Sequence, residues 1–103
     1  MKHYAMISQP MQGLSEREIQ AVRDAAAVKL DGMGYEVVNS YFPEIGGAQV
    51  ANPPVYALSR AIMEMSRCSA VYFCQGWQEA RGCKIEHDIA TAYGLDVMEE
   101  GAR

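Results

Sequence analysis

A chain of 103 residues, with 50% hydrophobic and 21% charged side chains, suits one globular domain over residues 1–103, which excludes a second core and a disordered chain. The formal net charge of −4 provides no basic surface, so long nucleic acid is not expected as a partner. The N-terminus lacks the features of a signal peptide, and no apolar run is long enough to span a membrane. We therefore expect a cytoplasmic protein with no membrane partner.

The first part of the chain predicts a strand, a helix and a second strand. Residues 3–8 form a short apolar run typical of a buried strand. Ser15 and Glu18 have the spacing of a capping box, and Gly34 provides a C-terminal stop. Residues 35–39 are rich in β-forming side chains and follow that stop at once. The apolar face expected for the helix comprises Ile19, Val22, Ala26, Leu30 and Met33.

An irregular segment and a second predicted helix come next. Residues 40–54 contain three prolines and a Gly-Gly pair, and a loop of this length in a small domain is usually functional. Prolines at 53 and 54 suit the first turn of a helix, which we expect to run to about Arg67. Its expected apolar face comprises Val55, Leu58, Ile62 and Met65.

The last part of the chain predicts a third strand, a third helix and an edge strand. Residues 69–74 are nearly continuous in apolar side chains, and residues 75–82 form a loop. A helix then ends at Gly94, with Ile85, Ile89 and Ala92 on its expected apolar face, and residues 95–98 form a fourth strand. The three cysteines, Cys68, Cys74 and Cys83, lack paired metal-ligand spacing, so we expect reduced thiols and no metal.

Strands that alternate with helices indicate parallel pairing through right-handed crossovers. We predict an α/β three-layer sandwich of the flavodoxin or Rossmann-like type, with a parallel four-stranded sheet in the order 2-1-3-4. In this arrangement a crevice opens where the first and third strands end. The loops at residues 9–13, 40–54 and 75–82 would all lie at that edge of the sheet.

The loop from Gly76 to Gly82 leads directly into the third helix, whose free backbone N–H groups attract an anion. Glu86 lies about one turn further on and shares a helix face with Ala90 and Tyr93, so its carboxylate is expected in the crevice. The alternative is a surface carboxylate that the helix dipole favours. His87 follows on another face of the helix, and we expect it to be solvated.

Two motifs in this sequence resemble those of a known superfamily. Ser8-Gln9-Pro10-Met11-Gln12-Gly13 is similar to a Ser-Gly-Pro-Met-x-Gly pattern at the end of a first strand. Gly76-Trp77, Ala80-Arg81-Gly82-Cys83 and Glu86 match a Gly-Trp-x-x-Ser-Arg-Gly-Ala-x-x-Glu pattern. Over nearly its whole length the chain resembles the nucleoside 2-deoxyribosyltransferase-like superfamily, and most closely its short DUF4406 members.

The resemblance implies that Glu86 is a nucleophile that attacks the anomeric carbon of a nucleoside or nucleotide, and cleaves or exchanges the N-glycosidic bond. It implies no cofactor. By position, Met6 and Ala80 replace a tyrosine and an aspartate of the transferases, which leaves open a non-catalytic nucleotide-binding sensor or sponge. The ligand-binding residues expected with Glu86 are Ser8, Gln9, Pro10, Tyr41, Gly76, Trp77, Arg81 and Gly82.

Two of these residues have plain structural alternatives. An alternative role for Arg81 is to pair with an acidic neighbour or to cap a loop. An alternative role for Trp77 is to pack in a subunit interface. The larger relatives form homo-oligomers, and a domain this short buries a modest fraction of its surface. We therefore expect a homo-oligomer, most simply a two-fold dimer.

Overall fold

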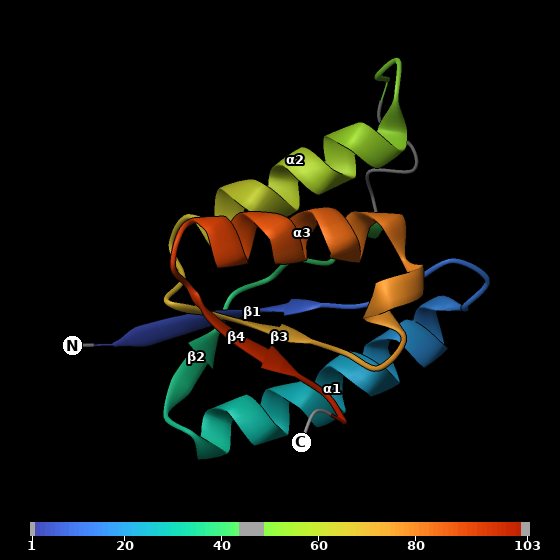
Figure 1. Cartoon of the computed structure of the whole chain (residues 1–103). Coiled ribbons are helices and arrows are strands. Elements are labelled where there is room, and N and C mark those ends of the chain that lie inside the picture. Colours follow the sequence, from blue (N-terminus) through green and yellow to red (C-terminus); the bar gives the residue numbers. More distant parts are fainter. Residues whose placement is uncertain (1, 44–48, 102–103) are drawn as a thin grey trace.

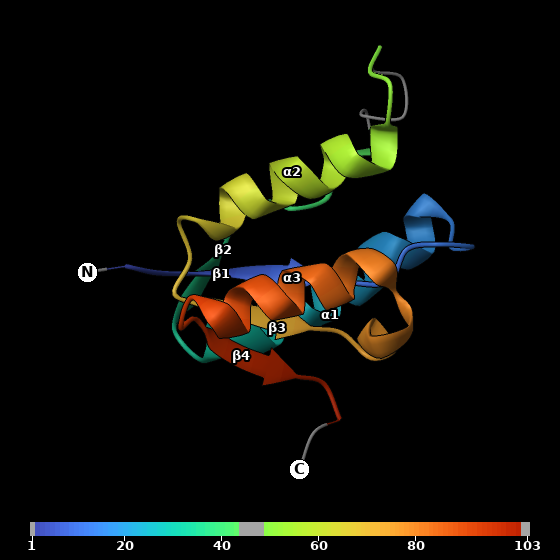
Figure 2. The same ribbon diagram turned by 45° about the horizontal axis from the view of Figure 1, so that its top comes forward.

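The computed structural model describes residues 2–43 and 49–101 and shows a three-layer α/β sandwich (Figure 1). The four strands pair in parallel in the order β2-β1-β3-β4, which confirms the predicted fold. Helix α1 covers one face of the sheet, and α2 and α3 lie side by side on the other (Figures 1 and 2). The elements are β1 (His3–Ser8), α1 (Glu16–Gly32), β2 (Tyr35–Val37), α2 (Pro53–Met65), β3 (Ala70–Phe73), the short helix η2 (Trp77–Glu79), α3 (Arg81–Ala92) and β4 (Asp96–Glu99).

The strand register brings the ends of the strands to one edge of the sheet. Ser8, the last residue of β1, pairs with Phe73 at the end of β3, and Phe73 pairs with Glu99 at the end of β4. Residues that follow these strands therefore start from the same edge. Part of the predicted loop of residues 40–54 also begins there, but residues 44–48 lie outside the described part of the chain.

Helix α1 begins as the sequence predicts, and three of its five predicted core positions, Ile19, Ala26 and Leu30, are buried. Ser15 Oγ accepts a hydrogen bond of 3.1 Å from the Glu18 backbone N–H, and the Glu18 carboxylate accepts one of 3.0 Å from the Ser15 N–H. The predicted core positions Val22 and Met33 were wrong, since they are 38% and 54% exposed. Arg23 replaces Val22 in the buried stripe, which comprises Ile19, Arg23, Ala26 and Leu30.

The predicted apolar faces of the other two helices were partly right, since Met65 of α2 is buried and Ile89 of α3 packs against the core. Helix α2 ends at Met65, not Arg67, and buries Ala61 and Met65, while Val55 is 59% exposed. Helix α3 buries Cys83, Glu86 and Ala90, whereas Ile85 is exposed. Small side chains at Ala61 and Ala90 let both helices approach the sheet closely, which leaves the larger aliphatic side chains at the sides.

The alternation of side chains along β1 and β3 divides the core between the two faces of the sheet. The α1 side holds Ala5, Ile7, Ala26, Leu30, Ala70, Tyr72 and Cys74. The opposite side holds Met6, Val38, Ala61, Met65, Val71, Phe73 and Ala90. Among the described helices, none combines the length and the apolarity that crossing a bilayer requires.

Candidate functional site

Five polar side chains are buried together with the apolar core at the end of β1. We call them the polar cluster: Ser8, Gln9, Arg23, Ser40 and Glu86. They come from β1, α1, the segment after β2, and α3. Burying a carboxylate and a guanidinium costs free energy that apolar side chains at the same positions would not cost. This cluster is therefore the part of the molecule that packing alone explains least.

Glu86 points into the molecule and contacts the end of β1. Glu86 is only 8% exposed. The Ser8 hydroxyl donates a hydrogen bond of 2.5 Å to Glu86 Oε1. Burial raises the pKa of the Glu86 carboxyl, while the Ser8 hydrogen bond and the charge of Arg23 act in the opposite direction. Glu86 is thus not the surface carboxylate of the alternative interpretation.

Arg23 reaches the same strand end from the other layer. Its guanidinium donates to Gln9 Oε1 at 3.2 Å, to the Ile7 carbonyl at 3.5 Å and to Ser40 Oγ. Ser40 in turn donates to the Ile7 carbonyl at 2.8 Å, and the guanidinium lies 5.7 Å from the centre of the Tyr41 ring. Tyr41, a predicted ligand residue, therefore borders the polar cluster through Arg23.

Sequence reasoning missed Arg23, although a signal was present. The spacing of Ile19, Ala26 and Leu30 leaves a gap that position 22 or position 23 can fill, and the sequence has the apolar Val22 next to the charged Arg23. An arginine in that gap indicates either a helix face rotated by one residue or a buried charge. The second interpretation is the one that the structure supports.

The loops after β1 and β3 contact one another. Gly76 has a φ of 88°, and a Cβ built at that position would lie 3.6 Å from Pro10 Cγ. Pro10 and Gly76, both predicted for the crevice, are therefore neighbours. Arg81 and Gly82 are exposed in the first turn of α3, where Ala80 provides no side-chain cap. The backbone N–H groups of that turn are consequently not bound by an N-cap side chain.

Trp77 lies in a separate cluster of aromatic rings. Its ring stacks on that of His87 with centroids 4.1 Å apart and planes 9° apart, and it lies 5.5 Å from the Phe73 centroid. We call these three residues the aromatic cluster. The buried Trp77 Nε1 has no hydrogen-bond partner among the described residues, and Trp77 makes no hydrogen bond to the polar cluster.

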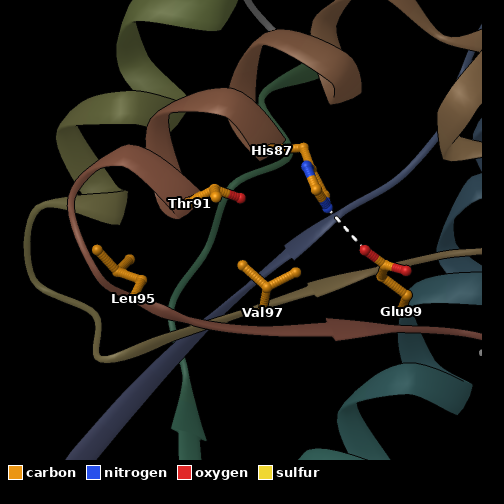
Figure 3. Close-up of a pocket in the computed structure, with 5 residues that line it drawn as sticks. All are labelled: His87, Thr91, Leu95, Val97 and Glu99. Atoms are coloured by element: carbon orange, nitrogen blue, oxygen red, sulfur yellow. Dashed lines mark hydrogen bonds and ion pairs between the residues drawn. The ribbon is translucent and has the colours of Figure 1, made fainter.

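The prediction that His87 is solvated was wrong. Its side chain is 21% exposed, and Nε2 lies 2.7 Å from Glu99 Oε2. Stacking on Trp77 and a tilted contact of 4.8 Å with Phe73 cover the ring. Because β4 runs beneath α3, the carboxylate at the end of β4 reaches a side chain that helical phase alone would place in solvent (Figure 3).

Two hollows on the surface do not coincide with the polar cluster. One, of about 420 Å³, lies between α3 and β4 (Figure 3) and is lined by His87, Thr91, Leu95, Val97 and Glu99. The other, also about 420 Å³, lies at the opposite edge of the sheet and is lined by Ala27, Val28, Asp31, Tyr35, Glu36 and Val37. Both are open surfaces beside an edge strand, and neither contains a buried charge. We therefore take the polar cluster, not a hollow, as the candidate site.

The cysteines provide no activated thiol. Burial raises the pKa of Cys68 and of Cys74 to about 11, and it also raises the pKa of Cys83, which lies near Ser8 and Glu86. Protonated thiols are poor nucleophiles and poor metal ligands. Within residues 2–43 and 49–101, no group of three or more His, Cys, Asp or Glu side chains could hold a metal ion. Glu86 is the one carboxylate of the polar cluster.

Comparison with known proteins gives one match. A family model with the description "Domain of unknown function (DUF4406)" matches residues 1–99, which is nearly the whole chain. No match was found among curated proteins or among solved structures.

Proposed function

The chain belongs to the DUF4406 family, and on that premise we propose that it is a nucleoside- or nucleotide-binding domain related to the nucleoside 2-deoxyribosyltransferases, with Glu86 as the nucleophile on an N-glycosidic bond. One observation carries the proposal. A carboxylate is buried at the C-terminal end of β1, in a parallel sheet where ligands generally bind at this edge. The two loop motifs that resemble the superfamily border the same edge.

The proposed chemistry proceeds in two displacements. A Glu86 carboxylate oxygen bonds to the anomeric carbon, and the N-glycosidic bond breaks with its electron pair passing to the base, which takes a proton from solvent. Water or a second base then displaces Glu86 from the sugar. Low polarity around a buried carboxylate leaves it less solvated than in water, which favours attack on a cationic, oxocarbenium-like centre. The Ser8 hydroxyl orients the carboxylate by its hydrogen bond.

A phosphate on the ligand would have a suitable neighbour at the start of α3. The first backbone N–H groups of this helix lack an N-cap side chain, and Arg81 is exposed among them. Helix N-termini and arginine both favour phosphate groups. These features support a nucleoside monophosphate as one class of ligand.

A second candidate function is nucleotide binding without turnover. It is favoured by the short hydrogen bond of 2.5 Å that already occupies a Glu86 oxygen, and by Met6 and Ala80 at positions where the transferases carry a tyrosine and an aspartate. Such a domain would sense or sequester its ligand. It would use the same strand end, but Glu86 would act there as a hydrogen-bond acceptor.

The decisive experiment measures free base released from a panel of deoxynucleosides and their 5′-monophosphates. We expect release by the wild-type protein, a loss of about 10³-fold or more in Glu86→Gln, and no loss in Glu79→Gln, which changes an exposed carboxylate just before α3. Intact-mass measurement after rapid quenching would show a deoxyribosyl adduct on the wild-type chain. Substrates left unchanged at high protein concentration would exclude catalysis, and ligand-induced thermal shifts in the same panel would then identify the binding function.

A further inference from the structure

Arg23 and Glu86 approach the last residues of β1 from opposite layers of the fold. Ser8 and Gln9 are adjacent on the chain, so their side chains leave the strand on opposite faces. Ser8 contacts Glu86 of α3, and Gln9 contacts Arg23 of α1. The guanidinium also binds the Ile7 carbonyl. Arg23 thus holds both neighbours of the residue that donates to Glu86.

We propose that Arg23 is a positioning residue for Glu86: by binding Ile7, Gln9 and Ser40 at once, it keeps the Ser8 hydroxyl directed at the Glu86 carboxylate. The inference rests on the proposed role of Glu86. The segment after β2 takes part because Ser40 binds both Arg23 and the Ile7 carbonyl. One planar guanidinium thereby joins the end of β1 to the segment after β2, a task to which its rigid fork of donors is suited.

Packing alone gives no reason for an arginine here. Arg23 occupies a buried position in the apolar stripe of α1 and is 6% exposed. Its hydrogen-bond acceptors are all neutral, and no carboxylate of the described residues lies within ion-pair distance of it. A buried cation held by neutral oxygens is less stable than an aliphatic side chain of similar volume. The positioning role explains why this side chain is polar.

The charge of Arg23 and the hydrogen bonds that it makes at the strand end both favour the ionised form of Glu86. Burial raises the pKa of Glu86, and the Ser8 hydrogen bond and the Arg23 charge are the two influences that lower it. The Ser8 hydrogen bond depends on Arg23 because Arg23 binds the residues on either side of Ser8. The charge effect comes from the Arg23 guanidinium itself. Cys83, the remaining titratable neighbour on α3, has a pKa that burial raises, so its thiol adds no charge at neutral pH.

The test is the titration of Glu86 followed by carboxyl ¹³C NMR, with Glu86→Gln used to assign the signal. We expect the midpoint to move to higher pH in Arg23→Gln, and to move by a smaller amount in Arg23→Lys, because lysine keeps the charge but has no planar fork. Arg17→Gln removes an exposed arginine from the same helix and should leave the midpoint unchanged. A midpoint in folded Arg23→Lys equal to that of the wild type would overturn the proposal.

Two further features keep this test decisive. If neither Arg23 variant folds, Ser40→Ala removes one acceptor of Arg23 without altering any charge; an upward shift of the Glu86 midpoint supports the proposal, and an unchanged midpoint refutes it. The titration needs no substrate, so it distinguishes this inference from the proposed function. Wild-type protein that releases no base, combined with shifted midpoints in the variants, would leave Arg23 as a positioning residue in a binding domain without catalysis.

Discussion

The polar cluster and the aromatic cluster meet in two consecutive residues of α3, yet they differ in what they do for the protein. Glu86 enters a buried set of charges and hydroxyls at the end of β1. His87 enters a stack of rings at the end of β3 and pairs with Glu99. Relative to apolar side chains at the same positions, the first arrangement raises the free energy of the folded state, whereas the stacked rings lower it. One turn of α3 therefore carries both a residue of the candidate site and a residue of the aromatic cluster.

The largest effect is expected from the aromatic cluster. Phe73→Ala should lower the free energy of unfolding by about 3–5 kcal/mol, because Phe73 is fully buried and contacts both Trp77 and His87. Chemical denaturation measures this loss. Tyr93→Ala is the control, since Tyr93 is 80% exposed, and its cost should stay within about 0.5 kcal/mol. Equal costs for the two variants would contradict the core role assigned to the cluster.

A smaller loss is expected for His87→Ala. The variant removes a ring stacked on Trp77 and a partner of Glu99, which together should account for about 1–2 kcal/mol. Denaturation curves at neutral pH measure the loss. His3→Ala, at an exposed position at the start of β1, serves as the control. A loss in His87→Ala no greater than in this control would show that the stack contributes no stability.

The smallest effect has the opposite sign. Glu86→Gln should raise the free energy of unfolding at pH 7 by roughly 0.5–1 kcal/mol, because it replaces a buried carboxylate by a neutral amide of similar shape. Burial raises the pKa of Glu86, so the folded chain binds this proton more tightly than the unfolded chain. Wild-type stability should therefore fall as the pH rises from the ordinary carboxyl pKa through the raised one, and this fall should be absent in the variant.

Thermal or chemical unfolding of wild type and Glu86→Gln at a series of pH values measures this difference. Glu79→Gln, an exposed carboxylate, provides the matched control and should follow the wild-type curve. A wild type that is more stable than Glu86→Gln at pH 7 would mean that the Ser8 hydrogen bond and the charge of Arg23 outweigh burial.

The sequence predicted the order of the elements and the sheet because strand and helix periods, the capping box and the stop at Gly34 are local signals. It predicted which loops meet because parallel strands end at one edge of the sheet. Part of each buried helix face was predicted correctly, but Val22, Val55 and Ile85 were wrong, because they are apolar and yet lie to the side of the contacts with the sheet. Helix propensity does not predict which face of a helix packs on the sheet when a second helix packs on the same face of the sheet.

At the candidate site, the sequence indicated Ser8, Gln9 and Glu86 but not the residues that hold them. Arg23 and Ser40 are far from the motifs along the chain and meet them only through tertiary packing. Trp77 was grouped with the crevice because it lies in the motif, whereas its ring packs on His87. The nucleotide ligand, the catalytic role of Glu86 and the homodimer remain predictions.

The alternation of Ser8 and Gln9 also limits how this domain is able to evolve. Deleting or inserting one residue within β1 would exchange the layers that these two side chains face, so that serine met α1 and glutamine met α3. Both bonds, to Glu86 and to Arg23, would be lost in one step. A substitution on α1 or on α3, by contrast, alters the contact on only one side of the strand. We therefore expect the six positions of that strand to keep a constant length in homologous sequences.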